Sequence, residues 1–162
     1  MPHLPPPRQP GRYAIALVCL GNICRSPMAH VVLESRLAEA GLDDRVVVRS
    51  SGTGDWHVGR PMDDRAAATL SRAGYDPSRH RARQYDDTWP AEHDLVLAMD
   101  ESNLDDLGGR SERVGLFRDL DPQGPGEVPD PYNGGTDGFE QVLDLVERTS
   151  DALVVAVADT LA

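Results

Sequence analysis

The sequence predicts an α/β protein, in which a parallel sheet lies between two layers of helices. Three observations support this fold class: short apolar runs alternate with segments of helical periodicity, the alternation continues through most of the 162 residues, and glycines or prolines separate the segments. Strands that alternate with helices form parallel sheets, because each helix returns the chain to the edge where the next strand starts. In such sheets, ligands bind beyond the carboxyl ends of the strands.

The first three elements follow from local patterns. The residues 13–18 are apolar and predict a buried strand. A helix follows, for which Ser26 is the expected N-cap, Pro27 fits the first turn and Gly41 marks the end. The second strand is predicted at 45–49, around a run of three valines.

The same signals predict the rest of the chain. Apolar runs mark the strands, glycines end the helices, and segments rich in glycine or proline are loops. The remaining elements are a loop at 50–59, a helix at 63–73, an irregular basic segment at 77–85, a strand at 94–99, a short helix at 101–107, a strand at 113–117, a long loop at 118–135 and a helix at 136–161. The sheet is therefore expected to contain four parallel strands with helices on both faces.

The beginning of the chain differs from the rest in composition. The residues 1–12 are rich in proline and are predicted to be a disordered tail before a single domain at 13–162. The first apolar run is too short for a membrane span of ~20 residues and lacks a small-residue cleavage site. We therefore expect a cytoplasmic monomer, while export by a route without a leader stays open.

Charge and composition exclude several functions. The net charge is −11, which argues against general binding to nucleic acid or to an anionic membrane. All 16 basic residues are arginine, so chemistry that depends on a lysine is excluded. The two cysteines lie five positions apart in one loop, which does not fit a disulfide framework. The spacing of histidines, cysteines and aspartates suggests no metal site, and the histidines other than His80 are expected at the surface.

One stretch, C-L-G-N-I-C-R-S-P from Cys19 to Pro27, combines a thiol with an anion site. A turn between a strand end and a helix start directs backbone N–H groups into one concavity, where the helix dipole adds positive charge. Arg25 can supply a two-pronged donor for phosphate oxygens, and Ser26 can donate a hydrogen bond to a Cys19 thiolate. The predicted phosphate-binding residues are Leu20, Gly21, Asn22, Ile23, Cys24, Arg25 and Ser26. A merely buried structural cysteine does not account for this combination of residues at these offsets.

A thiolate inside a phosphate site suggests nucleophilic attack on a phosphate ester. The leaving alkoxide or phenoxide needs a proton, which a carboxylic acid on a loop opposite the cradle can give. Asp130, in D-P-Y, is the best candidate, because Pro131 keeps it out of a helix and Tyr132 can form an aromatic wall. The other candidates are Asp119, Asp121 and Asp100, the last more typical of a helix cap.

The chain resembles the low-molecular-weight protein tyrosine phosphatases, in particular their bacterial and actinobacterial branch. The resemblance covers about residues 13 to 161 and rests on four motifs in this order: V-C-L-G-N-I-C-R-S-P, S-G-T-G-D-W-H-V-G, M-D-E-S-N and D-P-Y. It implies a four-stranded parallel sheet and the hydrolysis of phosphotyrosine in proteins without a metal or other cofactor. The implied partners are phosphotyrosine-containing proteins, including a bacterial tyrosine kinase and its substrates.

The resemblance also implies roles for individual residues. Cys19 is the nucleophile, Arg25 the phosphate clamp and Asp130 the general acid and base. A network of Asn22, Ser51 and His80 stabilises the loop, and Trp56 and Tyr132 flank the substrate ring. Asn133 departs from the D-P-Y-Y common in the family, so the rim of the pocket is less aromatic.

Several alternatives stay open on the sequence. One alternative is a phosphoarginine phosphatase of the same fold. Family members that resemble that branch carry a threonine at the position of Ile23, and the apolar residue in this chain favours an aromatic substrate instead. An arsenate reductase needs further cysteines, and none follows Cys24. A catalytically inactive phosphate-binding module is a further alternative, but such a module would not need the complete set of catalytic residues that this sequence contains. Cys24 is either loop filler or a redox partner that forms a reversible disulfide with Cys19.

Overall fold

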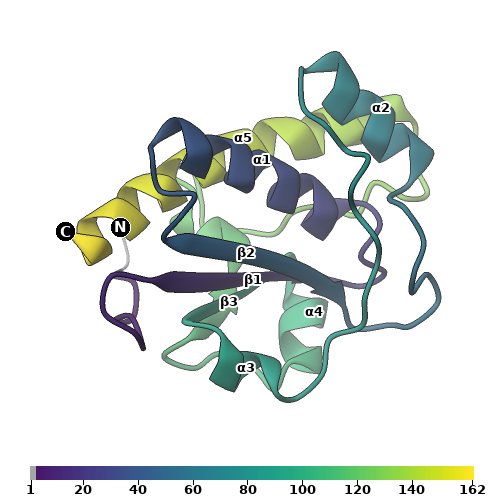
Figure 1. Ribbon diagram of the computed structural model, residues 1–162. Helices are drawn as coiled ribbons and strands as arrows, with labels where there is room; N and C mark the ends of the chain where they lie inside the picture. The colour runs from purple at the N-terminus through teal and green to yellow at the C-terminus, as the bar shows by residue number, and fades with distance from the viewer. Residues whose placement is uncertain (1–2) are drawn as a thin grey trace.

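Four parallel strands form one sheet in the order β2-β1-β3-β4, with helices on both faces (Figure 1). The structure is a computed structural model and describes residues 3–162. The elements are β1 (Tyr13–Cys19), α1 (Arg25–Glu39), β2 (Val46–Gly52), α2 (Asp64–Arg72), α3 (Trp89–Glu92), β3 (Leu95–Ala98), α4 (Glu101–Asp106), β4 (Val114–Leu116), a 3-10 helix η1 (Phe117–Leu120) and α5 (Thr136–Leu161). The predicted fold class is confirmed.

The alternation of side chains along the central strand β1 builds the two cores. Ile15 and Leu17 are fully buried beneath α1 and α5, whereas Val18 points to the opposite face of the sheet. There it packs with Trp89 of α3 and Leu104 of α4. In Figure 1, α1, α2 and α5 lie above the sheet and α3 and α4 below it. Because the strand is apolar on both faces, it reads as a continuous hydrophobic run.

The longest helix, α5, packs along α1 and covers one face of the sheet. Its inward side chains, such as Phe139 and Leu153, are fully buried. Arg36 of α1 ties the two helices together through Glu147 (3.2 Å) and Asp151 (2.8 Å) on α5. Within residues 3–162, no helix is long and apolar enough to cross a membrane.

Strand β2 is longer than the sequence predicted. We predicted a loop from residue 50 onward, because small hydroxyl residues and glycine are typical of loops. In the structure Ser50 and Ser51 continue the strand, and Gly52 pairs with Cys19 at its end. The backbone bonds to β1 and the burial of the two serines outweigh the weak strand preference of these residues.

Two further local predictions were wrong, and two short helices were missed. Ser26 is not the N-cap of α1, because that helix begins at Arg25 and the Ser26 hydroxyl contacts Cys19 and Asn22 instead. The short helices α3 and η1 were not predicted, since four residues are too few for a periodic pattern; they bury Trp89, and Phe117 with Leu120. His93, expected at the surface, is 1% exposed and stacks on Trp89 at 4.9 Å between ring centroids.

The segment before β1 also differs from its prediction. Residues 1–2 lie outside the described residues, but residues 3–12 lie against the body of the protein instead of forming a free tail. The hydroxyl of Tyr13 donates to the carbonyl of Pro5 at 2.9 Å, and the N–H of Arg8 donates to Asp94 at 2.6 Å. Leu4 packs against the main core. The proline-rich composition suggested disorder because the partners, Tyr13 and Asp94, lie outside the segment.

Candidate active site

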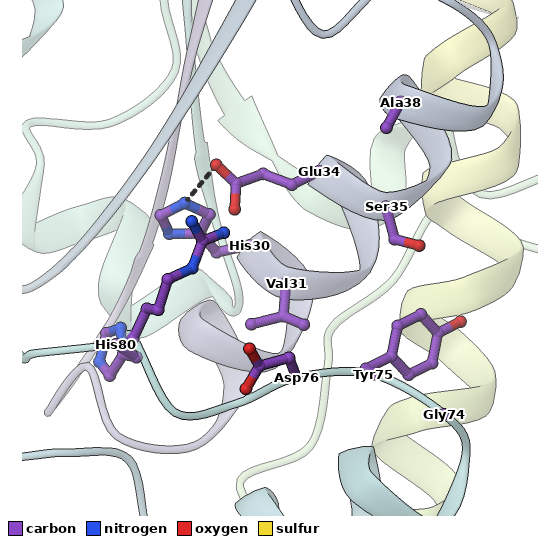
Figure 2. Close-up of a pocket in the computed structure, with 10 residues that line it drawn as sticks. His30, Val31, Glu34, Ser35, Ala38, Gly74, Tyr75, Asp76 and His80 are labelled. Carbon is purple, nitrogen blue, oxygen red and sulfur yellow. Dashed lines mark ion pairs between the residues drawn. The ribbon is translucent and has the colours of Figure 1, made fainter.

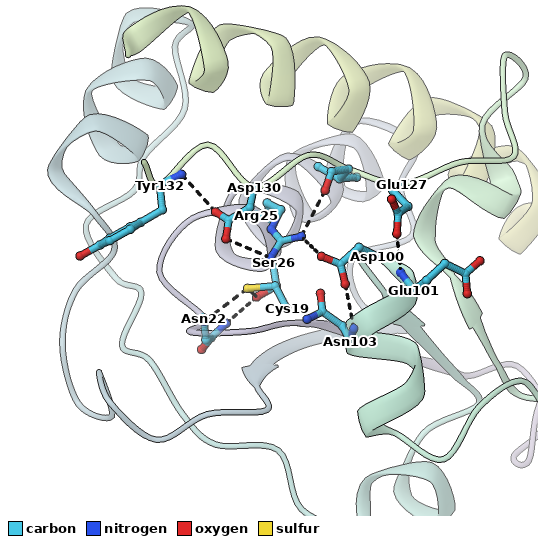
Figure 3. A network of polar contacts seen from close by, with 11 residues as sticks. Cys19, Asn22, Arg25, Ser26, Asp100, Glu101, Asn103, Glu127, Asp130 and Tyr132 are labelled. Atoms are coloured by element: carbon cyan, nitrogen blue, oxygen red, sulfur yellow. Dashed lines mark hydrogen bonds and ion pairs between the residues drawn. The ribbon is translucent and has the colours of Figure 1, made fainter. Parts of the chain in front are cut away.

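Cys19 ends β1, and the next five residues form the loop that leads into α1. The side chain is 3% exposed. Its sulfur lies 3.0 Å from the hydroxyl oxygen of Ser26 and accepts a hydrogen bond from the N–H of Asn22 at 3.3 Å (Figure 3). The thiol therefore lies at the carboxyl end of the strand, at the edge of the sheet, as predicted.

The carbonyl groups of this loop point outward, which turns its N–H groups inward. Four carbonyls accept hydrogen bonds from outside the loop: Cys19 from Thr53 N (3.0 Å), Leu20 from Gly54 N (2.8 Å), Asn22 from His80 Nε2 (2.7 Å) and Ile23 from Asp63 N (2.9 Å). In a trans peptide unit the carbonyl and the following N–H point in opposite directions. The N–H groups after these four carbonyls therefore face the centre of the loop and can bind an anion.

Asn22 is the structural centre of the loop. Its φ of +58° lies in the left-handed region, which asparagine tolerates better than most residues, and its side chain is fully buried. The amide nitrogen donates to the hydroxyl oxygens of Ser26 (2.8 Å) and Ser50 (3.1 Å), and the amide oxygen accepts from the N–H of Arg83 (3.0 Å). The loop is thus held by one buried and well-satisfied polar side chain.

The other two residues of the predicted network are His80, which contacts the loop through its side chain, and Ser51, which contacts it through its backbone. Burial lowers the pKa of His80 to about 4, so the ring is neutral at pH 7 and its Nε2–H donates to the carbonyl of Asn22. Ser51 contributes its backbone carbonyl, 3.4 Å from the hydroxyl of Ser26. The hydroxyl that meets Asn22 belongs to Ser50, which the sequence did not single out.

The Ser26 hydroxyl is oriented by its neighbours. Because Asn22 donates to Ser26 Oγ, the single hydroxyl hydrogen is available for another acceptor. The nearer acceptor is the sulfur of Cys19 at 3.0 Å, compared with 3.4 Å for the carbonyl of Ser51. This arrangement favours donation to the sulfur and stabilises a thiolate.

Arg25 is buried and held by acidic groups. Its Nη1 donates to Asp100 at 2.6 Å and to the carbonyl of Val128 at 3.1 Å, and its Nη2 lies 3.6 Å from Asp130. Burial acts to lower the pKa of Arg25, but the negative charges of Cys19, Asp100 and Asp130 outweigh it and the net shift is upward. The guanidinium is therefore a permanent cation beside the thiol.

Asp100 contacts the site through Arg25, a contact that was not predicted from the sequence. It caps α4 by accepting from the N–H of Asn103 at 2.7 Å, as its position suggested. Its other oxygen orients Arg25. The available signal was its place directly after the third strand, at the same sheet edge as Cys19.

Cys19, Arg25 and Asp130 meet in one cavity of about 210 Å³. The cavity is lined by Cys19, Leu20, Gly21, Ile23, Cys24, Arg25, Trp56, His57, Asp130, Tyr132 and Asn133. The carboxyl of Asp130 is 45% exposed and accepts from the N–H of Tyr132 at 3.1 Å. The structure thus brings together the three predicted catalytic side chains and both predicted aromatic walls.

Trp56 stands at the rim and is 68% exposed. Its indole lies directly over Gly54, where an added Cβ would come within 1.9 Å of the ring. His57 also lines the cavity, although it was expected to be an ordinary surface residue. The W-H-V-G segment in a glycine-rich loop was the signal that could have indicated it.

The rival acids Asp119 and Asp121 are engaged elsewhere. Asp119 pairs with Arg110 at 2.6 Å. Asp121 accepts from Arg148 and Arg118, and the hydrogen bonds from Arg148 lower the pKa of Asp121 well below its usual range. Both carboxylates stabilise the segment between β4 and α5.

A second cavity, of about 510 Å³, lies between α1 and the segment 74–80 (Figure 2). It is lined by His30, Val31, Glu34, Ser35, Ala38, Gly74, Tyr75, Asp76, Arg79 and His80. His30 lies 3.3 Å from Glu34 and 3.1 Å from the hydroxyl of Ser50. Although this cavity is larger, the thiol, the guanidinium and the acid all lie in the other one, so we place the chemistry there.

The fold and the site define a class of protein: an α/β phosphate-binding domain with a cysteine at the base of its anion cradle. Within residues 3–162, no group of histidine, cysteine and acidic side chains is arranged to hold a metal.

Comparisons with known proteins agree with this class. The family model for low molecular weight phosphotyrosine protein phosphatase matches residues 14–161. A low molecular weight protein-tyrosine-phosphatase of Streptomyces coelicolor is 44% identical over 156 residues, covering 91% of this chain and 94% of the relative. Low molecular weight protein-tyrosine phosphatase A of Mycobacterium tuberculosis is 41% identical over 157 residues, covering 91% and 93%. A protein tyrosine phosphatase structure from Entamoeba histolytica superposes with a TM-score of 0.86 at 29% identity, covering 91% of this chain and 97% of that one.

The chain belongs to the low molecular weight phosphotyrosine protein phosphatase family, and its enzyme class is that of the phosphatase hydrolases.

Proposed function

We propose that this enzyme hydrolyses phosphotyrosine in proteins through a phosphocysteine intermediate on Cys19. The observation that carries the proposal is the single cavity that holds Cys19, Arg25 and Asp130. The inward N–H groups and Arg25 neutralise the phosphate oxygens. Asp100 and Val128 occupy Nη1 of Arg25, so the edge formed by Nε and Nη2 remains for two of those oxygens.

The first chemical step transfers the phosphoryl group to sulfur. The thiolate of Cys19 attacks phosphorus, the bond from phosphorus to the tyrosine oxygen breaks, and the oxygen leaves with the electron pair. Protonated Asp130 donates its proton to this oxygen, which gives a neutral tyrosine and a phosphocysteine.

The second step regenerates the enzyme. Ionised Asp130 accepts a proton from water while the water oxygen attacks phosphorus. The bond between sulfur and phosphorus breaks, and the products are inorganic phosphate and the Cys19 thiolate. Asp130 therefore changes role from acid to base, and its carboxyl is 45% exposed, so water can reach it.

Aromatic walls support an aryl substrate. Trp56 and Tyr132, 68% and 45% exposed, flank the entrance, and Ile23 lines the cavity as an apolar side chain. A flat tyrosine ring can pack between such groups. The partners that follow are phosphotyrosine-containing proteins, including a bacterial tyrosine kinase and its substrates. A phosphoarginine substrate is the main rival within this fold.

We also propose a redox role for Cys24, which is free, buried and part of the same cavity as Cys19. A peroxide would oxidise the Cys19 thiolate to a sulfenic acid, and the Cys24 thiol would then condense with it to form a disulfide and water. A cytoplasmic location would suit this chemistry, because thiol reductants there can restore the two cysteines.

The catalytic proposal is tested with two substitutions and two aryl phosphates. Cys19→Ser should abolish turnover of p-nitrophenyl phosphate while the circular dichroism spectrum stays unchanged. Asp130→Ala should lower kcat/KM by about 10²- to 10⁴-fold on phenyl phosphate, whose leaving group needs the proton, and by under about tenfold on p-nitrophenyl phosphate.

The outcomes separate the assignments. Activity retained by Cys19→Ser would remove Cys19 as nucleophile, and equal losses on the two substrates would point to another acid. A comparison of kcat/KM on phosphotyrosine and phosphoarginine peptides tests the substrate class, with phosphotyrosine expected to be favoured.

A further inference from the structure

We propose that Arg65 is a positioning residue that holds the acid loop, residues 130–135, in place relative to the nucleophile. The inference rests on the proposed role of Asp130 as general acid. Arg65 lies in the first turn of α2, far along the chain from both Cys19 and Asp130. The assignment depends on the contacts of its guanidinium with the carboxyl of Asp63, with two carbonyls of the acid loop and with the ring of Tyr132.

The guanidinium of Arg65 binds an acid on one side and the acid loop on the other. Its Nε and Nη2 each lie 3.1 Å from an oxygen of Asp63. Its Nη2 also donates to the carbonyl of Tyr132 at 2.8 Å, and its Nη1 donates to the carbonyl of Gly134 at 3.1 Å. Four of its five N–H donors are thus engaged. The guanidinium carbon also lies 5.6 Å from the ring centroid of Tyr132.

A single residue, Tyr132, connects this contact to the proposed acid. The N–H of Tyr132 donates to Asp130 at 3.1 Å, while the carbonyl of the same residue accepts from Arg65 at 2.8 Å. Because both groups belong to Tyr132, a displacement of this residue would also move the N–H that orients the Asp130 carboxyl. The other oxygen of Asp130 lies 3.6 Å from Arg25.

Asp63 connects the same unit to the nucleophile loop. Its backbone N–H donates to the carbonyl of Ile23 at 2.9 Å, one of the outward bonds that orient the phosphate cradle. Its carboxyl caps α2 through the N–H of Arg65 at 2.8 Å and binds the guanidinium. Asp63 and Arg65 therefore link the loop that holds Cys19 to the loop that holds Asp130.

The ion pair with Asp63 alone does not explain this geometry. The ion pair with Asp63, whose side chains are 35% (Arg65) and 12% (Asp63) exposed, engages only Nε and one N–H of Nη2. The two carbonyl contacts reach 67 and 69 positions along the chain to one short loop. They need a planar donor with several N–H groups, which arginine supplies and lysine does not.

The test compares Arg65→Met and Arg65→Lys with the wild type, each also in an Asp130→Ala background. Both single variants should lower kcat/KM on phenyl phosphate by about 10- to 100-fold, because a small misplacement of the acid is costly. On p-nitrophenyl phosphate the loss should stay under about threefold, since that leaving group needs little protonation. In the Asp130→Ala background, where the acid is absent, the Arg65 substitutions should change either rate by less than about twofold.

Arg72→Met provides the matched control. Arg72 lies on the same helix and pairs with Glu140 of α5 at 2.9 Å, without reaching the acid loop. Its substitution should leave the ratio of the two rates unchanged. Equal losses on both substrates in both backgrounds would show a merely structural role for Arg65, and wild-type rates in both Arg65 variants would also overturn the inference. If Asp130→Ala itself shows no dependence on the leaving group, the acid assignment and this inference fail together.

Discussion

At the scale of single residues, the two cysteines of one loop have different surroundings. Cys19 accepts hydrogen bonds at its sulfur, from the N–H of Asn22 and from the Ser26 hydroxyl oriented toward it, and both stabilise a thiolate. Burial, followed by the negative charges of Asp63 and Cys19, raises the pKa of Cys24. Cys24 therefore stays a protonated thiol at neutral pH, which agrees with the proposal that Cys19 is the nucleophile.

This difference makes the proposed disulfide dependent on pH. Peroxide treatment should inactivate the enzyme reversibly and yield a Cys19–Cys24 disulfide. Because the pKa of Cys24 is raised, its thiolate fraction grows with pH, and the disulfide should form faster at pH 9 than at pH 7. Mass spectrometry of quenched samples measures the disulfide and the sulfonic acid of Cys19.

Cys24→Ser is the control for this experiment. It should keep its activity on p-nitrophenyl phosphate before oxidation and should lose it irreversibly afterwards. An irreversible sulfonic product in the wild type, without any disulfide, would remove Cys24 from a redox role.

At the scale of structural elements, the end of β2 shapes the phosphate cradle. Gly52 pairs with Cys19, and the next two N–H groups, of Thr53 and Gly54, bind carbonyls of the cradle loop. The same glycine exchanges backbone bonds with the segment around His80, through Arg83 and Tyr85. This strand end therefore connects the cradle to the loop that contains His80.

Gly52→Ala should distort the cradle. A Cβ at this position would come within 2.7 Å of the carbonyl oxygen of Leu20 and 2.9 Å of the nitrogen of Asn22, both backbone atoms. We expect kcat/KM on p-nitrophenyl phosphate to fall by about 100-fold. The free energy of unfolding, measured with urea, should fall by roughly 1–3 kcal/mol.

A second glycine gives the comparison. Gly135 has a φ of −86° and open space around its Cβ position, so alanine fits there without a clash. Gly135→Ala should therefore change kcat/KM little. If Gly52→Ala keeps wild-type activity, the close approach of β2 to the cradle is not needed for catalysis.

At the scale of the whole molecule, stability and site are connected through two histidines that are neutral in the folded state, one half-buried and one buried. His80 bonds to the cradle, and burial lowers its pKa to about 4. Burial also lowers the pKa of His93, which packs on Trp89 below the sheet. In the unfolded chain both histidines titrate near ~6.5, so the unfolded state binds more protons than the folded state as the pH falls. For His80 this difference develops between about pH 6.5 and 4.

The sign of the pH dependence follows from this difference. The stabilisation is fully present above about pH 6.5 and is lost as the pH falls toward the folded pKa. His80 alone should lower the free energy of unfolding by about 2 kcal/mol between pH 7 and pH 5. Urea denaturation at the two pH values measures this loss.

The matching variant is His80→Gln, which cannot titrate. Its stability should change less between pH 7 and pH 5 than that of the wild type. An identical pH dependence in the two proteins would show that His80 is not buried as a neutral ring.

Much of this architecture could be predicted from periodicity. The strand at 13–18, the helix from Asp63 and the last helix from Thr136 lie close to their predicted positions, because apolar spacing and caps are local signals. The extension of β2 through Ser50 could not be predicted, since it depends on pairing with β1. The contacts of Asp100 and Arg65 could not be predicted either, because their partners lie 67 to 75 positions away.

The fold class, the family and the residue types that meet at the sheet edge could all be predicted from the amino-acid sequence. This was possible because the strand, the nine-residue loop motif from Cys19 to Pro27 and D-P-Y are local patterns with a direct chemical meaning. The groups that hold these residues in place became visible only in three dimensions. The hydroxyl of Ser50, and not that of Ser51, binds Asn22; Asp100 binds Arg25; and Arg65 binds the acid loop. The physical reason is that a hydrogen bond depends on distance and direction in space, which spacing along the chain does not record.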